Sequence, residues 1–245
     1  KSGFDVVIAN PPYIQLQRAV NGSKKYADLY ENEGYETFDR RGDIYCLFYE
    51  KGLKLLKPKG ILVYISSNKW MRAGYGEKLR AFLSKSNPLK LIDFGGFKVF
   101  ESATVDTNIL LIQNAPNKNN LQACHFKNDY QKGQDIALYF GQNKVKLNKP
   151  TSAIWFIGTP AEVALKNKIE RAGVPLKNWE VKIYFGIKTG FNEAFIIDSA
   201  TKEQLIAEDP KSAEIIKPLL RGRDIKRYGY EFADKWLITT FPAKH

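Results

Sequence analysis

The stretch Phe4-Asp-Val-Val-Ile-Ala9, followed at once by Asn10-Pro11-Pro12-Tyr13, decides how the fold of this sequence is interpreted. A short run of β-branched apolar residues is typical of a strand that is buried on both faces of a parallel sheet. Proline lacks an N–H donor and restricts the residue before it, so Asn-Pro-Pro ends the strand. We therefore expect a buried strand whose carboxyl end presents Asn10 and Tyr13.

Strand and helix patterns alternate after this point. Residues 14–43 are polar and predict a long loop with at most a short helix. Helical spacing then runs from Ile44 to Leu55, and Pro58-Lys-Gly60 is a stop signal. Further strands are expected at 61–65, 89–94 and 108–113, with a basic helix near 75–85. This order predicts a doubly wound α/β sheet, and the last two strands, with no helix between them, are expected to pair antiparallel.

The pattern of predicted helices and strands changes near residue 150. Thr159, Pro160 and Glu162 form a capping box that opens a helix, and short β-rich segments and helical pieces follow. We place a domain boundary there, between a first domain, 1–150, and a second, 151–245.

The composition bounds the class of protein. Of 245 residues, 44% are hydrophobic and 13% aromatic, which is typical of a folded globular chain. The formal net charge of +12 favours a polyanionic partner, although a basic protein without such a partner fits the charge equally well. Cys46 and Cys124 have no metal-ligand spacing, so we expect two core thiols, no metal site and no disulfide framework.

No apolar run is long enough for a membrane span, and no signal peptide is visible, so we expect a soluble cytoplasmic protein without a membrane partner. The chain begins with Lys1 rather than Met and reaches a strand almost at once. We therefore expect that it is cut from something longer.

The four residues after the first strand suit the activation of an exocyclic amine. The amino nitrogen of adenine is a poor nucleophile because its lone pair is delocalised into the ring. Two acceptors that take its two N–H groups make the lone pair available, and the Asn10 side-chain carbonyl and the neighbouring backbone carbonyl supply such a pair. Without the sheet pattern, Asn-Pro-Pro-Tyr is only a turn; after a buried strand we interpret it as a site.

The segment Phe4–Tyr13 resembles motif IV of the amino-group methyltransferases that use S-adenosylmethionine. Residues 42–60 and the following Ile-Leu-Val-Tyr-Ile are similar to the TaqI-type branch of adenine-N6 DNA methyltransferases, which includes the methylase portions of fused restriction-modification enzymes. The resemblance runs on through 98–102 and 107–112, and weakly through 216–225, which resembles part of the target recognition domain of that family.

The resemblance implies site-specific adenine-N6 methylation of DNA in a restriction-modification system. Asn10 and the carbonyl of Pro11 would accept the amino hydrogens of an adenine flipped out of the duplex. Tyr13 would stack on the base, Pro12 would line the pocket, and Phe100 would pack against the other side of the base.

Two assignments have equally plain structural readings. The other interpretation of Phe100 is an ordinary core aromatic beside Phe94 and Phe97. Arg221 and Arg223 lie at a turn in a basic, tyrosine-rich segment, where they are candidates for DNA contacts or simply for a solvated surface. The expected partner is double-stranded DNA, and the parent chain of this family can carry an upstream nuclease domain.

The sequence departs from the family in its cofactor motifs. The glycine-rich turn after the first strand and the acidic residue after the second precede motif IV in the family and are not present here. Gly95-Gly96 and Gly186–Gly190 do not substitute for them, because neither follows the first strand of the sheet and opens a helix.

The expected fold is therefore the C-terminal half of a Rossmann-like methyltransferase sheet, in residues 1–150, followed by the start of a smaller α+β target recognition domain, in 151–245. S-adenosylmethionine would be the cofactor of the full-length parent. This chain alone is expected neither to bind that cofactor measurably nor to methylate DNA.

Other readings stay open. A protein-glutamine or RNA methyltransferase can use Asn-Pro-Pro-Tyr in the same way, although the polar insertion after Tyr13 and the sizeable second domain count against it. The chain could also be a non-catalytic DNA-binding specificity module. Transfer to the cytosine amino group is a nearer competitor than carbon-5 methylation, for which no Pro-Cys pair supplies a thiolate.

Overall fold

The computed structural model describes residues 3–100, 105–127, 129–147, 150–182, 186–187 and 189–239. The chain packs as two compact units, residues 1–174 and 175–245. Trp155 lies beyond residue 150, yet it is buried in the core of the first unit, where its ring meets Trp70 edge to face at 5.1 Å. The structural division thus follows residue 174; the functional division at residue 150 remains a prediction.

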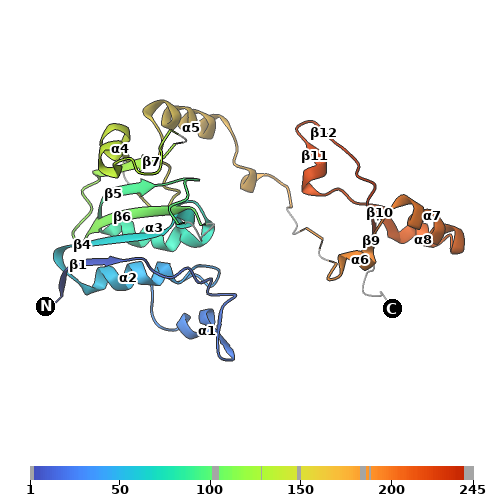
Figure 1. Ribbon diagram of the computed structural model, residues 1–245, viewed down its shortest axis with the longest axis horizontal. Helices are drawn as coiled ribbons and strands as arrows, with labels where there is room; N and C mark the ends of the chain where they lie inside the picture. Colours follow the sequence, from blue (N-terminus) through green and yellow to red (C-terminus); the bar gives the residue numbers. More distant parts are fainter. Residues whose placement is uncertain are drawn as a thin grey trace. The chain divides into compact units, whose positions relative to one another are not determined.

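The first unit is built around one six-stranded sheet (Figure 1) with the strand order β1-β4-β6-β5-β7-β8. The strands of this unit are β1 (Phe4–Ala9), β2 (Val20–Asn21), β3 (Lys24–Lys25), β4 (Leu56–Ser67), β5 (Asn87–Asp93), β6 (Thr107–Gln113), β7 (Leu121–His125) and β8 (Val145–Leu147). Its helices are α1 (Tyr26–Tyr30), α2 (Tyr45–Leu55), α3 (Glu77–Lys85), α4 (Ile136–Asn143) and α5 (Pro160–Ala172), with 3₁₀ turns η1 (Asn68–Met71) and η2 (Gly74–Gly76).

The sheet has the predicted mixed α/β character. β1 pairs parallel with β4, and β5 pairs parallel with β7. β6 inserts between β4 and β5 and is antiparallel to both, which confirms the antiparallel pairing expected for the segments at 89–94 and 108–113. Because β1, β4, β5 and β7 run in one direction, their carboxyl ends meet at one edge of the sheet.

Helices α2 and α3 cover one face of the sheet. Tyr49 and Leu53 from α2 and Leu79 and Leu83 from α3 share a buried cluster with side chains of the central strands. On the opposite face, a second cluster of aromatic residues packs on β5, β6 and β7 and includes Phe94, Phe126, Tyr130, Tyr139 and Phe140. This second cluster reaches only the β5 side of the sheet.

The prediction that residues 4–9 are buried on both faces is wrong for this chain. Val7 and Ala9 pack on the core, but Phe4, Val6 and Ile8 are 59%, 52% and 74% exposed. β1 is an edge strand, and the described residues place no helix over the face that carries these three side chains. The strand has the predicted apolar residues, but no described element buries the side chains of Phe4, Val6 and Ile8.

The predicted stop signal, Pro58-Lys59-Gly60, lies inside a strand. Helix α2 does end at Leu55, but β4 starts at Leu56 and contains the tripeptide. The pairing with β1 is irregular there, and Lys59 has a φ of 67°. The Lys59 N–H donates to the carbonyl of Asn114 at 2.8 Å, so the segment bends while keeping its backbone bonded.

Residues 14–43 contain the expected short helix, α1, together with the small β2–β3 hairpin. The segment also has its own core, in which Leu16 and Ala27 pack against Ile44 and Leu47 at the start of α2. The segment is therefore a folded insertion that packs on α2.

The second unit is a small α+β body. Its three-stranded antiparallel sheet has the order β10-β13-β9, and a separate hairpin pairs β11 with β12. The elements are η3 (Leu176–Asn178), α6 (Asn192–Phe195), β9 (Ile196–Ile197), α7 (Ser199–Glu208), α8 (Ser212–Ile215), β10 (Ile216–Pro218), η4 (Gly222–Asp224), β11 (Ile225–Lys226), β12 (Gly229–Tyr230) and β13 (Trp236–Ile238).

Several smaller expectations can be compared with the structure. The capping box is confirmed, because Thr159 accepts from the Glu162 N–H and Glu162 accepts from the Thr159 N–H. Cys46 and Cys124 are buried and free. Within the described part of the chain, no helix is both long and apolar enough to cross a membrane.

Candidate active site

Asn10 and Tyr13 meet at the carboxyl end of β1. Asn10 is exposed, whereas Pro11 is buried and fixes the chain between them. The Tyr13 hydroxyl donates to Asn10 Oδ1 at 3.3 Å, and the Tyr13 ring is half-buried. A carbonyl oxygen has two lone pairs, so Asn10 Oδ1 retains the capacity for a second donor.

The loop after Tyr13 is clamped by Asp43, immediately before helix α2. The Ile14 N–H donates to Asp43 Oδ1 at 2.8 Å, and the Ile14 carbonyl accepts from the Ile44 N–H at 2.9 Å. Gln15 forms a β-bridge with Asp43, and the Leu16 N–H reaches the Gly42 carbonyl. The residues on both sides of this loop are thus bonded to regular structure.

Tyr13, Tyr45 and Tyr75 pack together beside the same loop. Tyr13 packs edge to face on Tyr45, with ring centroids 6.2 Å apart, and the Tyr45 and Tyr75 hydroxyls are 2.7 Å apart. Burial, with a contribution from the charge of Asp43, raises the pKa of Tyr13. Burial likewise raises the pKa of Tyr75, to about 12, so both phenols are neutral near pH 7.

Burial also raises the pKa of Asp43 from its ordinary value, although the N–H groups of Ile14, Tyr45 and Ile44 act in the opposite direction. A half-buried acceptor with several backbone donors is a rigid anchor. Asp43 therefore acts on the site by holding the Asn10–Tyr13 loop.

The carboxyl end of β4 continues this polar edge. Ser66 is buried and its hydroxyl lies 3.0 Å from the Tyr49 hydroxyl. The Asn108 amide donates to the carbonyls of Ser66 and Ser67 at 3.2 and 2.9 Å. These bonds tie β4 to β6 next to the end of β1, so the platform beneath Asn10 is fixed.

Phe100 has no recorded contact with the Asn10–Tyr13 segment among the described residues, so its role stays a prediction. Phe100 is half-buried, and among the described residues it makes no ring contact with Tyr13. Phe94 and Phe97 belong to the second aromatic cluster. Pro12, the other residue expected to line the pocket, is exposed beside Asn10.

In the second unit, Arg221 and Arg223 behave differently from each other. The Arg221 guanidinium donates to both carboxylate oxygens of Asp224, at 3.0 and 2.9 Å, and its hydrogen bonds lower the pKa of Asp224 to about 2. Arg221 thereby closes the η4 turn. Arg223 is exposed. Of the two, Arg223 has the guanidinium available for a phosphate.

The described residues do not form a cofactor site of the expected kind. Gly95 has a φ of 56° and follows β5, but it turns back toward His125, and the described residues between it and β6 form no helix. Part of the 186–190 segment lies outside the described residues. Among the described residues, no group of three His, Cys, Asp or Glu side chains is arranged to hold a metal ion.

The sequence predicts roles for Asn10 and Tyr13 but none for Asp43. The signal was an acidic residue directly before the first helical turn of α2, which is common at helix starts and therefore carries little weight on its own. Its partner, Ile14, lies 29 residues away, and nothing in the sequence pattern connects the two.

Comparisons with known proteins agree with the fold. Residues 1–100 match the family described as Eco57I restriction-modification methylase. Over 130 residues, 53% of the chain, the sequence is 35% identical to the Type II restriction enzyme and methyltransferase RM.Eco57I of Escherichia coli, of which this covers 13%. Over 97% of the chain it is 25% identical to the Type II methyltransferase M.XhoI of Xanthomonas vasicola, of which 44% is covered.

Among solved structures, the Type IIL restriction-modification enzyme MmeI in complex with DNA matches 95% of the chain and 29% of its own, with a TM-score of 0.62 and 14% identity. That likeness concerns the fold. The chain spans less than half the length of the curated relatives named above. On these matches, the chain is similar to the methyltransferases of type II restriction-modification systems.

Proposed function

We propose that this chain supplies the acceptor side of an enzyme that methylates the N6 amino group of adenine in DNA, within a restriction-modification system and with S-adenosylmethionine as the methyl donor. The observation that carries the proposal is the arrangement of Asn10. Its side chain is exposed at the carboxyl end of β1, and its carbonyl oxygen lies 3.3 Å from the hydroxyl of Tyr13 on a loop held by Asp43.

The chemistry follows from this placement. Asn10 Oδ1 and the carbonyl of Pro11 each accept one hydrogen of the adenine amino group, which localises the nitrogen lone pair for attack on a methyl group. Proline stiffens the backbone that bears the second acceptor. After methyl transfer the nitrogen releases one proton to water, because neither the neutral amide of Asn10 nor a backbone carbonyl is a base.

The adenine must leave the duplex to reach Asn10, and an aromatic face stabilises a flipped base. Tyr13 is half-buried, so one side is supported by Tyr45 while the remainder is accessible for stacking. Phe100 remains the proposed partner on the other side of the base. Asparagine at the first position favours adenine over the cytosine amino group, for which serine is the more common residue.

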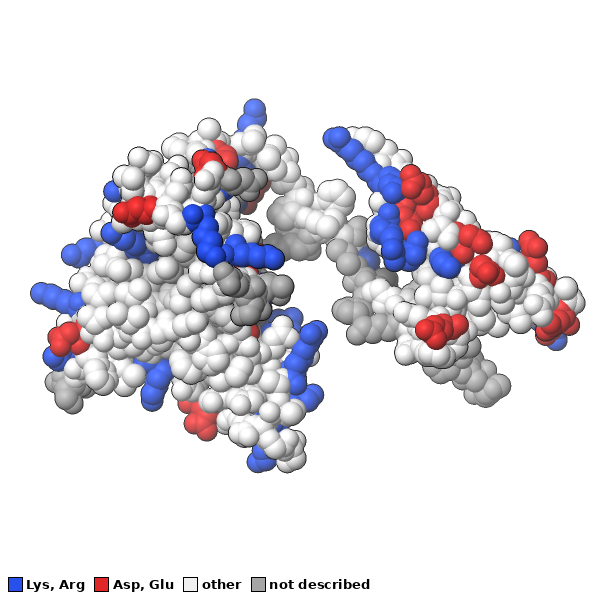
Figure 2. Space-filling model, viewed as in Figure 1, with Lys and Arg blue, Asp and Glu red and all other residues white. Residues whose placement is uncertain are grey.

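Several features support DNA as the substrate. The net charge is +12, and positive side chains that neutralise phosphates gain affinity by releasing counterions. Figure 2 shows Lys and Arg side chains beside the β11–β12 part of the second unit, where Arg227 lies over the 89% exposed Tyr228. We propose residues 151–245 as the beginning of the target recognition domain. The fused relative RM.Eco57I supports a nuclease domain in the same parent chain.

The methyl donor requires a part beyond the described residues. These residues provide the acceptor groups but no glycine-rich strand-turn-helix, so no step is assigned to the cofactor here. The exposed apolar side chains of Phe4, Val6 and Ile8 on β1 support the proposal that a cofactor-binding half packs on this edge.

The test is product identification with the complete protein that carries this chain. The protein is incubated with radiolabelled S-adenosylmethionine in three separate reactions, which contain duplex DNA, RNA or a cell protein extract. Enzymatic digestion of the DNA to nucleosides should yield labelled N6-methyl-2′-deoxyadenosine. Label in N4-methylcytosine, in RNA or in glutamine side chains would refute the adenine assignment.

A further inference from the structure

A buried carboxylate organises a second polar site on the same edge of the sheet. Asp93, at the end of β5, is 1% exposed and accepts four hydrogen bonds. Oδ1 accepts from Asn68 Nδ2 at 2.7 Å and from the Gly95 N–H at 3.1 Å. Oδ2 accepts from Arg72 Nη2 at 2.8 Å and lies 3.0 Å from His125 Nδ1.

Arg72 and His125, which contact Asp93 Oδ2, are positioned by this carboxylate but remain partly exposed to solvent. The side chains of Arg72 and His125 are 58% and 40% exposed, and their remaining nitrogens have no partner among the described residues. Gly95 contributes to this geometry, because a Cβ at this position would lie 2.7 Å from His125 Cε1. Asp93 thus orients two donors outward by bonding to one end of each.

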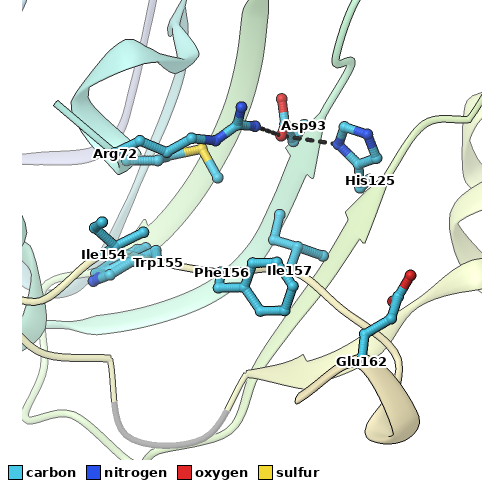
Figure 3. Close-up of a pocket in the computed structure, with 9 residues that line it drawn as sticks. Arg72, Asp93, His125, Ile154, Trp155, Phe156, Ile157 and Glu162 are labelled. Atoms are coloured by element: carbon cyan, nitrogen blue, oxygen red, sulfur yellow. Dashed lines mark hydrogen bonds and ion pairs between the residues drawn. The ribbon is translucent and has the colours of Figure 1, made fainter. Parts of the chain in front are cut away.

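An apolar wall faces these donors across a cavity of about 400 Å³. Figure 3 shows Arg72 and His125 on either side of Asp93, with the segment Ile154–Ile157 opposite. Phe156 is held in place because its ring lies over Gly158, where a Cβ would be 2.5 Å from the ring. One half of the cavity therefore offers polar donors, and the other offers exposed apolar surface.

We propose that this cavity binds a backbone phosphate of DNA on Arg72 and His125, with the adjoining deoxyribose against Phe156 and Ile154. The inference rests on the proposed function and adds a contact away from the reacting base. Arginine is well suited to phosphate because its planar fork donates two hydrogen bonds.

The position of the cavity suits a DNA strand that also reaches Asn10. β1, β4, β5 and β7 are parallel, so Asn10, Asp93 and His125 lie on one edge of the sheet. Asp93 is three strand positions from β1, which places the two ends roughly 14 Å apart at the usual strand spacing. A DNA strand covers that distance in a few nucleotides.

The other charges around the cavity are compatible with an anion. Glu162 is an acidic side chain at its rim, and the Thr159 N–H donates to its Oε2 at 2.7 Å, which holds this carboxylate at the start of α5 in the capping box. An adjoining hollow shares His125, Ile157 and Glu162 and is also lined by Lys127 and Lys144. The approach to the phosphate position is thus lined by additional cations.

The test compares DNA binding by this 245-residue chain and by Arg72→Gln, using a fluorescent duplex and a series of salt concentrations. Loss of one phosphate contact should reduce the slope of log K against log salt by about 0.9, and affinity at moderate salt should fall about tenfold. Arg72→Lys should keep the slope. Lys57→Gln is the matched control, because Lys57 pairs with Asp5 at the opposite edge of the sheet.

A second measurement guards against a folding defect in the variants. The sequence has two histidines, His125 and His245, so the His125 ring resonances are assigned by their loss in His125→Gln. In the wild-type chain, these resonances should shift on addition of the duplex and should shift less with inorganic phosphate at equal phosphate concentration.

An unchanged salt slope in a folded Arg72→Gln, or a His125 response to inorganic phosphate but not to the duplex, would overturn the inference. So would a wild-type chain that binds no duplex. These outcomes are independent of which base the complete protein methylates, so the phosphate site and the proposed reaction fail separately.

Discussion

The backbone N–H of Ile14 donates a 2.8 Å hydrogen bond to the carboxylate of Asp43, across 29 residues of sequence. This bond connects the loop that follows Asn10-Pro-Pro-Tyr to the first turn of α2. The position of Asn10 therefore depends on a residue that does not contact it.

Replacing Asp43 should loosen this loop. Asp43→Ala leaves the Ile14 N–H without its acceptor, which should cost about 1–3 kcal/mol in the free energy of unfolding. Asp43→Asn keeps an oxygen in the same place and should restore most of the loss. Urea denaturation measures both. Asp39→Ala removes local contacts with Arg41, a backbone hydrogen bond and an exposed ion pair, and is the control; equal effects at positions 39 and 43 would contradict the clamp.

Helix α2 packs closely on β4 at a glycine. A Cβ on Gly52 would meet the Tyr64 hydroxyl and would lie 2.6 Å from Leu62 Cδ1. Gly52→Ala should lower the free energy of unfolding by about 1–3 kcal/mol, because overpacking outweighs the gain in helix propensity. Gly141→Ala is the matched change in helix α4, where no atom lies within 4 Å, and it should be neutral or stabilising. Thermal melts that rank the two variants the other way would contradict this packing.

Much of the fold could be predicted because its elements have strong local signals. The strands at 61–65 and 108–113, the helix of α2 and the capping box at Thr159 all follow from apolar periodicity and capping residues. The insertion of β6 between β4 and β5 did not follow, because the register Ile92↔Ile109 depends on tertiary pairing. Apolar residues in a strand predict that its face is stable when buried, but they do not predict which part of a protein buries it. The exposed face of β1 illustrates this.

Because one face of β1 is exposed, substitutions of apolar residues on that face should have little effect on stability. Ile8 is 74% exposed, so Ile8→Thr should change the free energy of unfolding of this chain by less than about 0.5 kcal/mol. Leu62, on the neighbouring strand, is fully buried, and Leu62→Ala should cost about 2–5 kcal/mol. Denaturant melts of both variants test the comparison. A large loss for Ile8→Thr would mean that this face is covered within the chain.

Acid stability should depend on Asp93. Burial raises its pKa, but the hydrogen bonds from His125, Asn68 and Gly95 outweigh burial and leave the pKa below the ordinary 3.8. A carboxyl whose folded pKa is lowered stabilises the fold above its unfolded pKa, and this contribution is lost as the pH falls through the folded pKa. Asp93→Asn should therefore weaken the loss of stability between neutral and strongly acidic pH. Parallel pH profiles for wild type and variant would contradict the assignment.

The candidate site could be predicted only in part. Asn10, Pro11, Pro12 and Tyr13 are contiguous, so a short motif carries them together. The Asp43 clamp and the Arg72–Asp93–His125 cluster join residues from different strands and turns, and no local pattern identifies them. Arg221 was a reasonable candidate for DNA, but its bidentate bond to Asp224 is visible only in the structure.

The most direct measurement is the rate of N6-adenine methylation by Asn10 variants of the complete protein. Removing an acceptor of the amino group should lower kcat for Asn10→Ala by about 10²–10³, the loss typical of one transition-state hydrogen-bonding group. DNA affinity should be nearly unchanged, and Asn21→Ala, in the β2–β3 hairpin, should behave as wild type. A kcat for Asn10→Ala within a few-fold of wild type, with N6-methyladenine still the product, would contradict the central claim that Asn10 activates the adenine amine.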